Sequence, residues 1–167
     1  MLGLEQLQEP NFIQLLTQNV APGCTMIVNR ALLNIALPIP YEAVMHDWWL
    51  ILVASLFGRI GYINEPTIAY RQHESNQVGA NSLSLNAMLR DIRNSGASYK
   101  RRLLQAQLQA GALIARYGEK MDKSDLAAAS VYASLSTRPF LLRRIIAWRY
   151  GLRKNGFIRN AGFYLLM

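Results

Sequence analysis

The sequence has little of several residue types, and each shortage excludes a class of protein. Cys24 is the single cysteine, so the chain forms no internal disulfide, and we expect a reducing compartment. Charged residues make up only 17% of the chain and hydrophobic residues 51%, which excludes intrinsic disorder and favours a large partner surface or membrane contact. The N-terminal residues lack the basic and apolar regions of a secretory signal. The longest strongly apolar run covers residues 48–57, about half of the roughly 20 that a spanning helix needs.

Acidic residues are absent from the last 30 residues, and the net charge of +8 is concentrated there. Residues 1–137 hold 11 basic and 10 acidic side chains and are nearly neutral. Bulky apolar residues alternate with the basic residues of the tail, which are Arg138, Arg143, Arg144, Arg149, Arg153, Lys154 and Arg159. We therefore predict a basic amphipathic tail over residues 138–167 that binds an anionic membrane surface. The alternative is a basic helix that packs against another part of the protein. No nucleic-acid-binding module accompanies the tail, so no nucleic acid is expected as a partner.

The hydrophobic pattern divides the chain into a mixed front half and a helical back half. In the front half it predicts helices at residues 4–18, 30–36 and 48–57, with strands at residues 25–28 and 62–70. Helical periodicity then covers residues 83–92, 99–117 and 124–135, and an Arg-rich segment follows at 139–152. The expected organisation is an α/β segment over residues 1–82, a helical extension over 83–137 and the basic tail over 138–167.

The most informative stretch is bracketed by the only two histidines, His46 and His73. Asp47 follows the first of them and precedes two tryptophans, Trp48 and Trp49. Aromatic neighbours remove water from a carboxylate and raise its pKa, which suits a general base that acts on a hydroxyl. Asp47 is equally suited to be the N-cap of the following helix, and the two roles are compatible. The two tryptophans could be ordinary core residues, but adjacent helical residues point in different directions, so one that faces a cleft could stack on a sugar ring.

Two further features are candidates for ligand contact. His73 follows the end of the second predicted strand beside Arg71, where a metal or a phosphate could bind, although a lone histidine is more often a surface or core residue. The turn Gly23-Cys24-Thr25 would let a ligand approach the backbone closely, but an ordinary tight turn has the same composition.

Taken in order, these motifs resemble the second half of family 2 glycosyltransferases, in particular the rhamnosyltransferase-like branch that builds bacterial cell-surface polysaccharides. The resemblance covers residues 19–80 and rests on Pro22-Gly23-Cys24-Thr25-Met26, His46-Asp47-Trp48-Trp49, Glu65-Pro66, and Tyr70-Arg71-Gln72-His73 with Asn76 and Gly79. It implies the C-terminal portion of a GT-A fold, an α/β class, followed by a helical, basic region. It also implies a nucleotide-sugar donor similar to dTDP-rhamnose, a glycan or lipid-linked acceptor, and a divalent metal, Mg²⁺ or Mn²⁺.

The resemblance assigns roles to single positions. Asp47 matches the aspartate that deprotonates the acceptor hydroxyl for inverting attack on the anomeric carbon. His73 matches a histidine that helps to hold the metal on the donor diphosphate. The remaining candidates are expected to contact substrate, and they are Gly23, Cys24, Thr25, His46, Trp48, Trp49 and Arg71.

The sequence departs from the family pattern because it contains no Asp-x-Asp metal motif and no Gly-rich nucleotide-binding turn. We therefore expect a partial enzyme whose donor-binding half and most metal ligands lie outside this chain, and which is inactive alone. The expected location is the inner, cytoplasmic face of the plasma membrane. The main alternative is a non-catalytic remnant or membrane-associated interaction protein. A His-Asp phosphohydrolase is a weaker alternative, since no histidine precedes His46.

Overall fold

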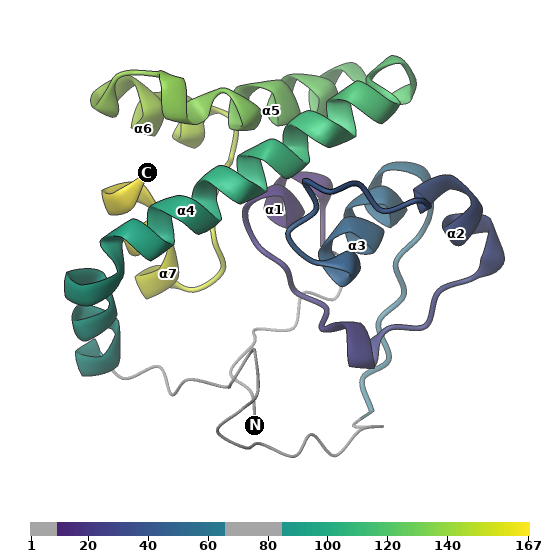
Figure 1. Cartoon of the computed structure of the whole chain (residues 1–167), viewed down its shortest axis with the longest axis horizontal. Helices are drawn as coiled ribbons and strands as arrows, with labels where there is room; N and C mark the ends of the chain where they lie inside the picture. Colours follow the sequence, from purple (N-terminus) through teal and green to yellow (C-terminus); the bar gives the residue numbers. More distant parts are fainter. Residues whose placement is uncertain (1–9, 66–84) are drawn as a thin grey trace.

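Figure 1 shows the computed structural model of the chain, which describes residues 10–65 and 85–167, with side chains omitted for 85–98 and 158. All regular structure among these residues is helical. The α-helices are α1 (Phe12–Thr17), α2 (Arg30–Ala36), α3 (His46–Phe57), α4 (Leu85–Tyr117), α5 (Lys123–Ala133), α6 (Phe140–Arg149) and α7 (Phe157–Leu166). Three single 3₁₀ turns are η1 (Gly23–Thr25), η2 (Gly118–Lys120) and η3 (Leu135–Thr137). None of the helices in these two ranges is long and apolar enough to cross a membrane.

Side-chain caps explain where the first two helices begin. The Asn11 side chain accepts a hydrogen bond from Gln14 N at 2.9 Å, and Asn29 accepts one from Leu32 N at 2.9 Å. Each amide oxygen satisfies a backbone N–H that has no partner within the first turn. The predicted helix at residues 30–36 is confirmed, and the helix predicted for 4–18 is observed from Phe12 onward, after Pro10.

The back half differs from the prediction in two places. The helices predicted at residues 83–92 and 99–117 form one continuous helix, α4, of 33 residues. Gly96 and its serine neighbours do not interrupt it, because a glycine costs a helix only about 1 kcal/mol relative to alanine. The helix α7 was not predicted, and it follows Gly156 at a positive φ of 80°.

The strand predicted at residues 25–28 is wrong. Thr25 ends the turn η1, and among residues 10–65 and 85–167 no strand lies beside the extended backbone that follows, in which Ile27 is 96% exposed. β-branched residues favour a strand only where a second strand is present to complete the ladder. The strand predicted at 62–70 is a loop as far as residue 65, and its remainder lies outside the described residues. With no strand in residues 10–65 or 85–167, the expected GT-A α/β fold is not confirmed.

The long helix α4 runs diagonally across the molecule, and α5, α1 and α7 pack against it. In Figure 1, α5 and α6 lie along one side of α4, whereas α1, α3 and α7 lie along the other. One hydrophobic core contains fully buried residues from all of these helices, among them Leu15, Trp49, Leu113, Tyr132 and Phe163. Thr17 also donates a hydrogen bond to Arg153 O at 2.6 Å, which joins α1 to the tail. The segments 1–82, 83–137 and 138–167 thus share a core, and their boundaries as domains stay a prediction.

The C-terminal end of α2 is held by side chains from α4 and α3. The Arg116 guanidinium donates to the carbonyls of residues 35–38, with Nη1 2.6 Å from Pro38 O. Tyr117 Oη donates to Ile35 O at 2.6 Å, and Trp49 Nε1 donates to Ala36 O at 2.9 Å. The last carbonyls of a helix have no partner within it, and an arginine there both binds them and complements the helix dipole. This contact fixes the front half of the chain to the end of α4.

Lys154 lies in an unfavourable environment for a cation. Its ammonium group is 5.2 Å from the centre of the Tyr99 ring and 6.0 Å from that of Phe163. Burial, together with the nearby charges of Arg159 and Arg102, lowers the pKa of Lys154 to about 8. The aromatic rings offset only part of the cost of desolvating the charge.

We therefore predict that Lys154→Met stabilises the protein at pH 7. In the unfolded protein Lys154 keeps its proton up to about pH 10. In the folded protein it loses the proton near pH 8. Raising the pH from 7 to 9.5 consequently favours the folded wild type. The melting temperature of Lys154→Met should exceed that of the wild type by about 2–4 °C at pH 7, the shift produced by ~1 kcal/mol in a domain of this size. The difference should shrink toward pH 9.5. Lys123→Met, on the exposed side of α5, is the control, and an equal pH trend in both variants would contradict the assignment.

Candidate functional site around Asp47

Asp47 lies in the first turn of α3, where its side chain is only 2% exposed. Its carboxylate accepts three hydrogen bonds. Oδ1 accepts from Asn19 Nδ2 at 2.9 Å and from Trp48 N at 2.6 Å, and Oδ2 accepts from Gly23 N at 2.8 Å. The helix begins one residue before Asp47, with Met45 as the N-cap, so Asp47 is not the N-cap itself. It nevertheless accepts from a first-turn N–H, which is the function of a cap.

The two oxygens of Asp47 differ in how many partners they have. A carboxylate offers about four acceptor positions. Oδ1 uses two of them, whereas Oδ2 accepts a single N–H within the described part of the chain. Oδ2 is therefore the atom on which a further donor, such as a substrate hydroxyl, can be accommodated.

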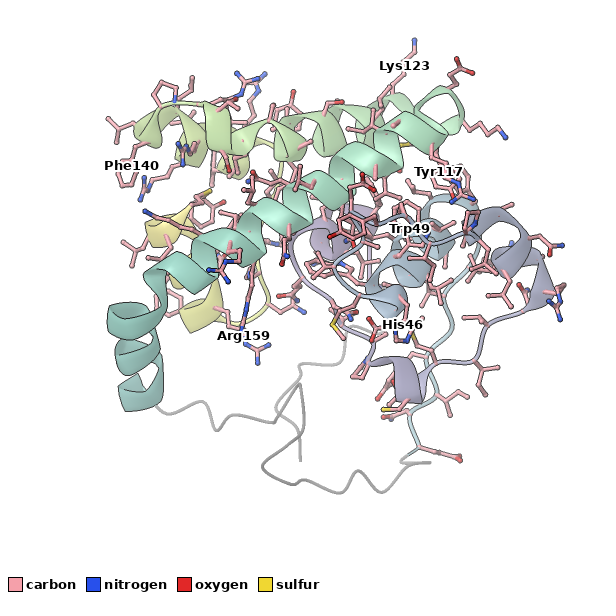
Figure 2. All side chains as sticks on the ribbon, in the orientation of Figure 1. His46, Trp49, Tyr117, Lys123, Phe140 and Arg159 are labelled. Atoms are coloured by element: carbon pink, nitrogen blue, oxygen red, sulfur yellow. The ribbon has the colours of Figure 1, made fainter. Side chains whose placement is uncertain are left out.

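Gly23 lies so close to His46 that a Cβ at position 23 would require the histidine side chain to move. A Cβ on Gly23 would lie 2.8 Å from His46 Nε2 and 3.4 Å from Asp47 Oδ2. A carbon this close to a ring atom cannot be accommodated without a shift. His46 itself is exposed, and Figure 2 shows it at the start of α3, beside the turn η1. The structure thus brings together three of the residues that the sequence singled out, although 23 residues separate Gly23 from His46 in the chain.

The rest of the turn faces solvent. Cys24 is exposed, and the exposed Thr25 donates from Oγ1 to Pro22 O at 2.7 Å. That bond closes the 3₁₀ turn on itself. The predicted contacts of Cys24 and Thr25 with substrate stay predictions.

The two tryptophans point in different directions, as expected for neighbours on a helix. Trp49 is fully buried in the core, with its ring centre 6.1 Å from that of Tyr117 (Figure 2). Trp48 is half-buried and donates from Nε1 to Leu15 O at 2.6 Å. Trp49 therefore has a structural role in this arrangement, and Trp48 is the better placed of the two to contact a ligand.

Sequence reasoning missed Asn19. Besides donating to Asp47, its side chain accepts from Ala21 N at 3.1 Å, which shapes the loop that leads to Gly23. An asparagine that bonds a backbone N–H two residues ahead is typical of a turn. Its position before Ala21-Pro22-Gly23 was the only signal available, because the contact with Asp47 spans 28 residues.

A side chain from α4 fixes the loop before α3. The buried Gln109 accepts a hydrogen bond from Val44 N at 2.8 Å. Val44 lies two residues before His46, so this bond sets where α3 begins relative to the core. The long helix thereby positions the candidate site.

The predicted metal ligand lies outside the described residues. His73 and Arg71 both belong to the range 66–84, so the structure does not place them. Within the described residues, no group of three or more histidine, cysteine or carboxylate side chains is arranged to hold a metal ion. Both oxygens of Asp47 already accept protein N–H groups. The described residues therefore do not fit a divalent metal site.

Comparison with known proteins gives one relationship. No protein-family model matches the chain, and no solved structure matches it. A dTDP-rhamnosyl transferase of Shigella flexneri, RfbG, is 38% identical to it over 72 residues. The match covers 36% of this chain and 24% of that enzyme, so the chain corresponds to about a quarter of the length of its curated relative. This partial likeness supports a glycosyltransferase-like relationship.

We predict that Gly23→Ala destabilises the protein by about 0.5–1.5 kcal/mol, the cost of moving the exposed His46 side chain out of its rotamer to make room for the methyl group. The measurement is the free energy of unfolding in urea. Gly61→Ala is the matched control, because a Cβ at Gly61 meets no atom within 4 Å. In a His46→Ala background the cost of Gly23→Ala should fall by more than half, because the closest contact is gone. An unchanged cost in that background would show that the two residues do not touch.

Proposed function

We propose that this chain forms the acceptor side of an inverting glycosyltransferase, which transfers rhamnose from a donor similar to dTDP-rhamnose to a glycan or lipid-linked acceptor. The partial likeness to a dTDP-rhamnosyl transferase supports the reaction class. The observation that supports the site is the carboxylate of Asp47, fixed by three N–H donors with one acceptor position of Oδ2 left over.

In the proposed reaction, the acceptor hydroxyl donates its hydrogen bond to Asp47 Oδ2. The hydroxyl oxygen attacks the anomeric carbon of the donor, the bond from that carbon to the diphosphate breaks, and the proton passes to Asp47. Such transfer requires the hydroxyl to lie about 2.6–3.2 Å from the accepting oxygen. The bonds from Asn19 and Trp48 hold Oδ1, so the carboxylate cannot rotate and Oδ2 keeps its direction.

Two neighbours are proposed to shape the approach of the acceptor. The exposed His46 stands beside Oδ2 across Gly23, and the half-buried Trp48 offers an aromatic surface for a sugar ring. A side chain at position 23 would occupy the space next to both His46 and Oδ2. The glycine therefore lets its loop approach closely enough for Gly23 N to bind Oδ2 beside His46.

The proposed reaction also uses a divalent metal, most of whose ligands are proposed to lie outside this chain. When bound, Mg²⁺ or Mn²⁺ would neutralise charge on the departing diphosphate. His73 is the proposed ligand in this chain. Because the described residues do not form a metal site, no step of the reaction above depends on it.

The alternative function is that of a non-catalytic interaction protein in which Asp47 is purely structural. One observation favours it: the Asp47 side chain is 2% exposed and already bonded through both oxygens, as a carboxylate that only ties a loop to a helix would be. An amide at position 47 would lower the rate of sugar transfer if Asp47 is the base, and would not if Asp47 is purely structural.

The test compares Asp47→Asn with Asn19→Ala in an active preparation, in which the donor-binding part of the enzyme is present. We predict that Asp47→Asn lowers kcat for transfer from dTDP-rhamnose by about 10²–10⁴-fold, since an amide cannot accept the proton. Both variants should lose stability, because each breaks a buried hydrogen bond at a cost of about 1–3 kcal/mol. Asn19→Ala keeps the carboxylate and should lower kcat by less than about tenfold.

Thermal unfolding of each variant separates folding from chemistry. A folded Asp47→Asn protein with kcat within a few fold of the wild type would refute the role as base and favour the structural alternative. A preparation of the wild type that binds dTDP-rhamnose but transfers no sugar to any glycan or lipid-linked acceptor would contradict the proposed function as a whole.

A further inference from the structure

Several large apolar side chains of the helix α6 are strongly exposed. Leu141, Ile145 and Trp148 are 71%, 61% and 78% exposed, and Phe140 is 56% exposed at the start of the helix. Only Ala147 of this helix is buried in the core. Figure 2 shows Phe140 at the outer end of α6, directed away from the body of the molecule. Large apolar side chains grouped on one exposed face indicate a surface that contacts something else.

The exposed face of α6 has an apolar centre with an arginine on each side. At about 100° per residue, Trp148, Leu141 and Ile145 fall within an arc of about 60°. Arg144 lies about 40° to one side of that arc and Arg149 about 40° to the other. The Arg144 guanidinium lies over the Phe140 ring, 3.3 Å from its centre, and also donates to Leu165 O at 3.2 Å. We call Phe140, Leu141, Arg144, Ile145, Trp148 and Arg149 the α6 face.

No acidic side chain balances these arginines along the tail. Asp125 is the last acidic residue of the chain, and seven basic residues follow it. A second copy of the protein would place arginines against arginines across a shared α6 face, which is unfavourable. An anionic partner with an apolar interior complements both the charge and the apolar centre.

The neighbouring helix α7 has a different role, although its sequence looks similar. Phe163 is fully buried, Met167 is 3% exposed, and Leu152 before the helix is fully buried. Tyr164 Oη also donates to Leu152 O at 3.1 Å. Phe163 thus packs α7 against α4, although Phe157 and Leu165 of the same helix are 89% and 66% exposed. On α6, by contrast, Ala147 is the one buried residue.

We propose that the α6 face binds the surface of an anionic lipid membrane. A helix of 10 residues is about 15 Å long, half the thickness of a bilayer core, so α6 would lie in the plane of the interface. Trp148, Leu141 and Ile145 would enter the boundary between headgroups and acyl chains. Arg144 and Arg149 would remain at the level of the lipid phosphates, where long basic side chains with apolar stems are favourable.

The test is co-sedimentation of the full chain with vesicles of phosphatidylcholine alone or with about 30% phosphatidylglycerol. We expect at least tenfold tighter binding to the anionic vesicles. Raising NaCl from about 0.1 M to about 1 M should abolish most of that difference, since the Debye length falls from about 10 Å to about 3 Å. Equal binding to both vesicle types, or no binding to either, would overturn the proposal.

Matched substitutions test whether α6 is responsible. Trp148→Glu should weaken binding to anionic vesicles at least tenfold. Phe157→Glu replaces a still more exposed aromatic residue, 89% exposed at the start of α7, and should weaken it less than threefold. Arg149→Gln should cost about fivefold, the effect of about one charge at the membrane surface, and Lys123→Gln on α5 should cost less. If Phe157→Glu weakened vesicle binding as much as Trp148→Glu, or Lys123→Gln as much as Arg149→Gln, the assignment to α6 would be overturned.

Tryptophan fluorescence provides a second measurement that needs no destabilising variant. Trp148 is the one strongly exposed tryptophan of the three, because Trp49 is buried and Trp48 half-buried. Anionic vesicles should shift the emission to the blue, and brominated lipids should quench it. Trp148→Phe should keep the binding and lose the shift. A shift that persists in Trp148→Phe would contradict the proposal. Concentration-dependent dimerisation without vesicles that Trp148→Glu abolishes, with vesicle binding unchanged, would identify a second copy as the partner instead.

Discussion

A carboxylate removed from water must be given hydrogen-bond donors, and this requirement organises the front half of the molecule. Asp47 obtains its donors from its own helix, through Trp48 N, and from a loop far away in sequence, through Asn19 and Gly23 N. The loop can approach closely only because residue 23 has no Cβ to collide with His46. The candidate site therefore consists of a helix start and a loop that a buried charge holds together.

That arrangement in turn depends on α4. Near the C-terminal end of this helix, Arg116 and Tyr117 bind the last carbonyls of α2. About two turns earlier in the same helix, Gln109 accepts a hydrogen bond from Val44 N. These bonds fix both ends of the segment that connects α2 to α3. Because α4 also packs on α1 and α5, the position of Asp47 is coupled to the core of the whole chain. A side chain in the site is thus held by contacts across more than sixty residues of sequence.

Local sequence signals predicted part of this structure. The helices predicted over residues 30–36 and 48–57 follow from apolar periodicity, and the second begins two residues earlier than predicted, at His46. Asp47 was singled out because it precedes two tryptophans, and in the structure it is buried. The strand predicted at 25–28 is wrong because β-branched residues form a strand only beside another strand, and the described part of the chain provides none there; Gly23 lies instead beside the start of α3. Trp49 was expected near a ligand, yet its indole N–H has a partner in the core, at Ala36 O. The roles of Asn19 and Gln109 arise from contacts across 28 and 65 residues, which no local pattern encodes.

The two proposals concern separate surfaces, and the charge distribution explains why they can coexist. Residues 1–137 are nearly neutral, whereas the positive charge lies in the tail, and Figure 1 shows α6 and α3 on opposite sides of α4. Attraction to an anionic surface is screened over about 10 Å at 0.1 M salt, so the arginines of α6 govern attachment without acting on the carboxylate of Asp47. For a lipid-linked acceptor, attachment would raise the local concentration of substrate and leave the chemical step unchanged. Loss of the α6 face should then raise the apparent KM for a lipid-linked acceptor, whereas loss of the Asp47 carboxylate should lower kcat. With a soluble acceptor, loss of the α6 face should leave KM unchanged, and loss of the carboxylate should still lower kcat.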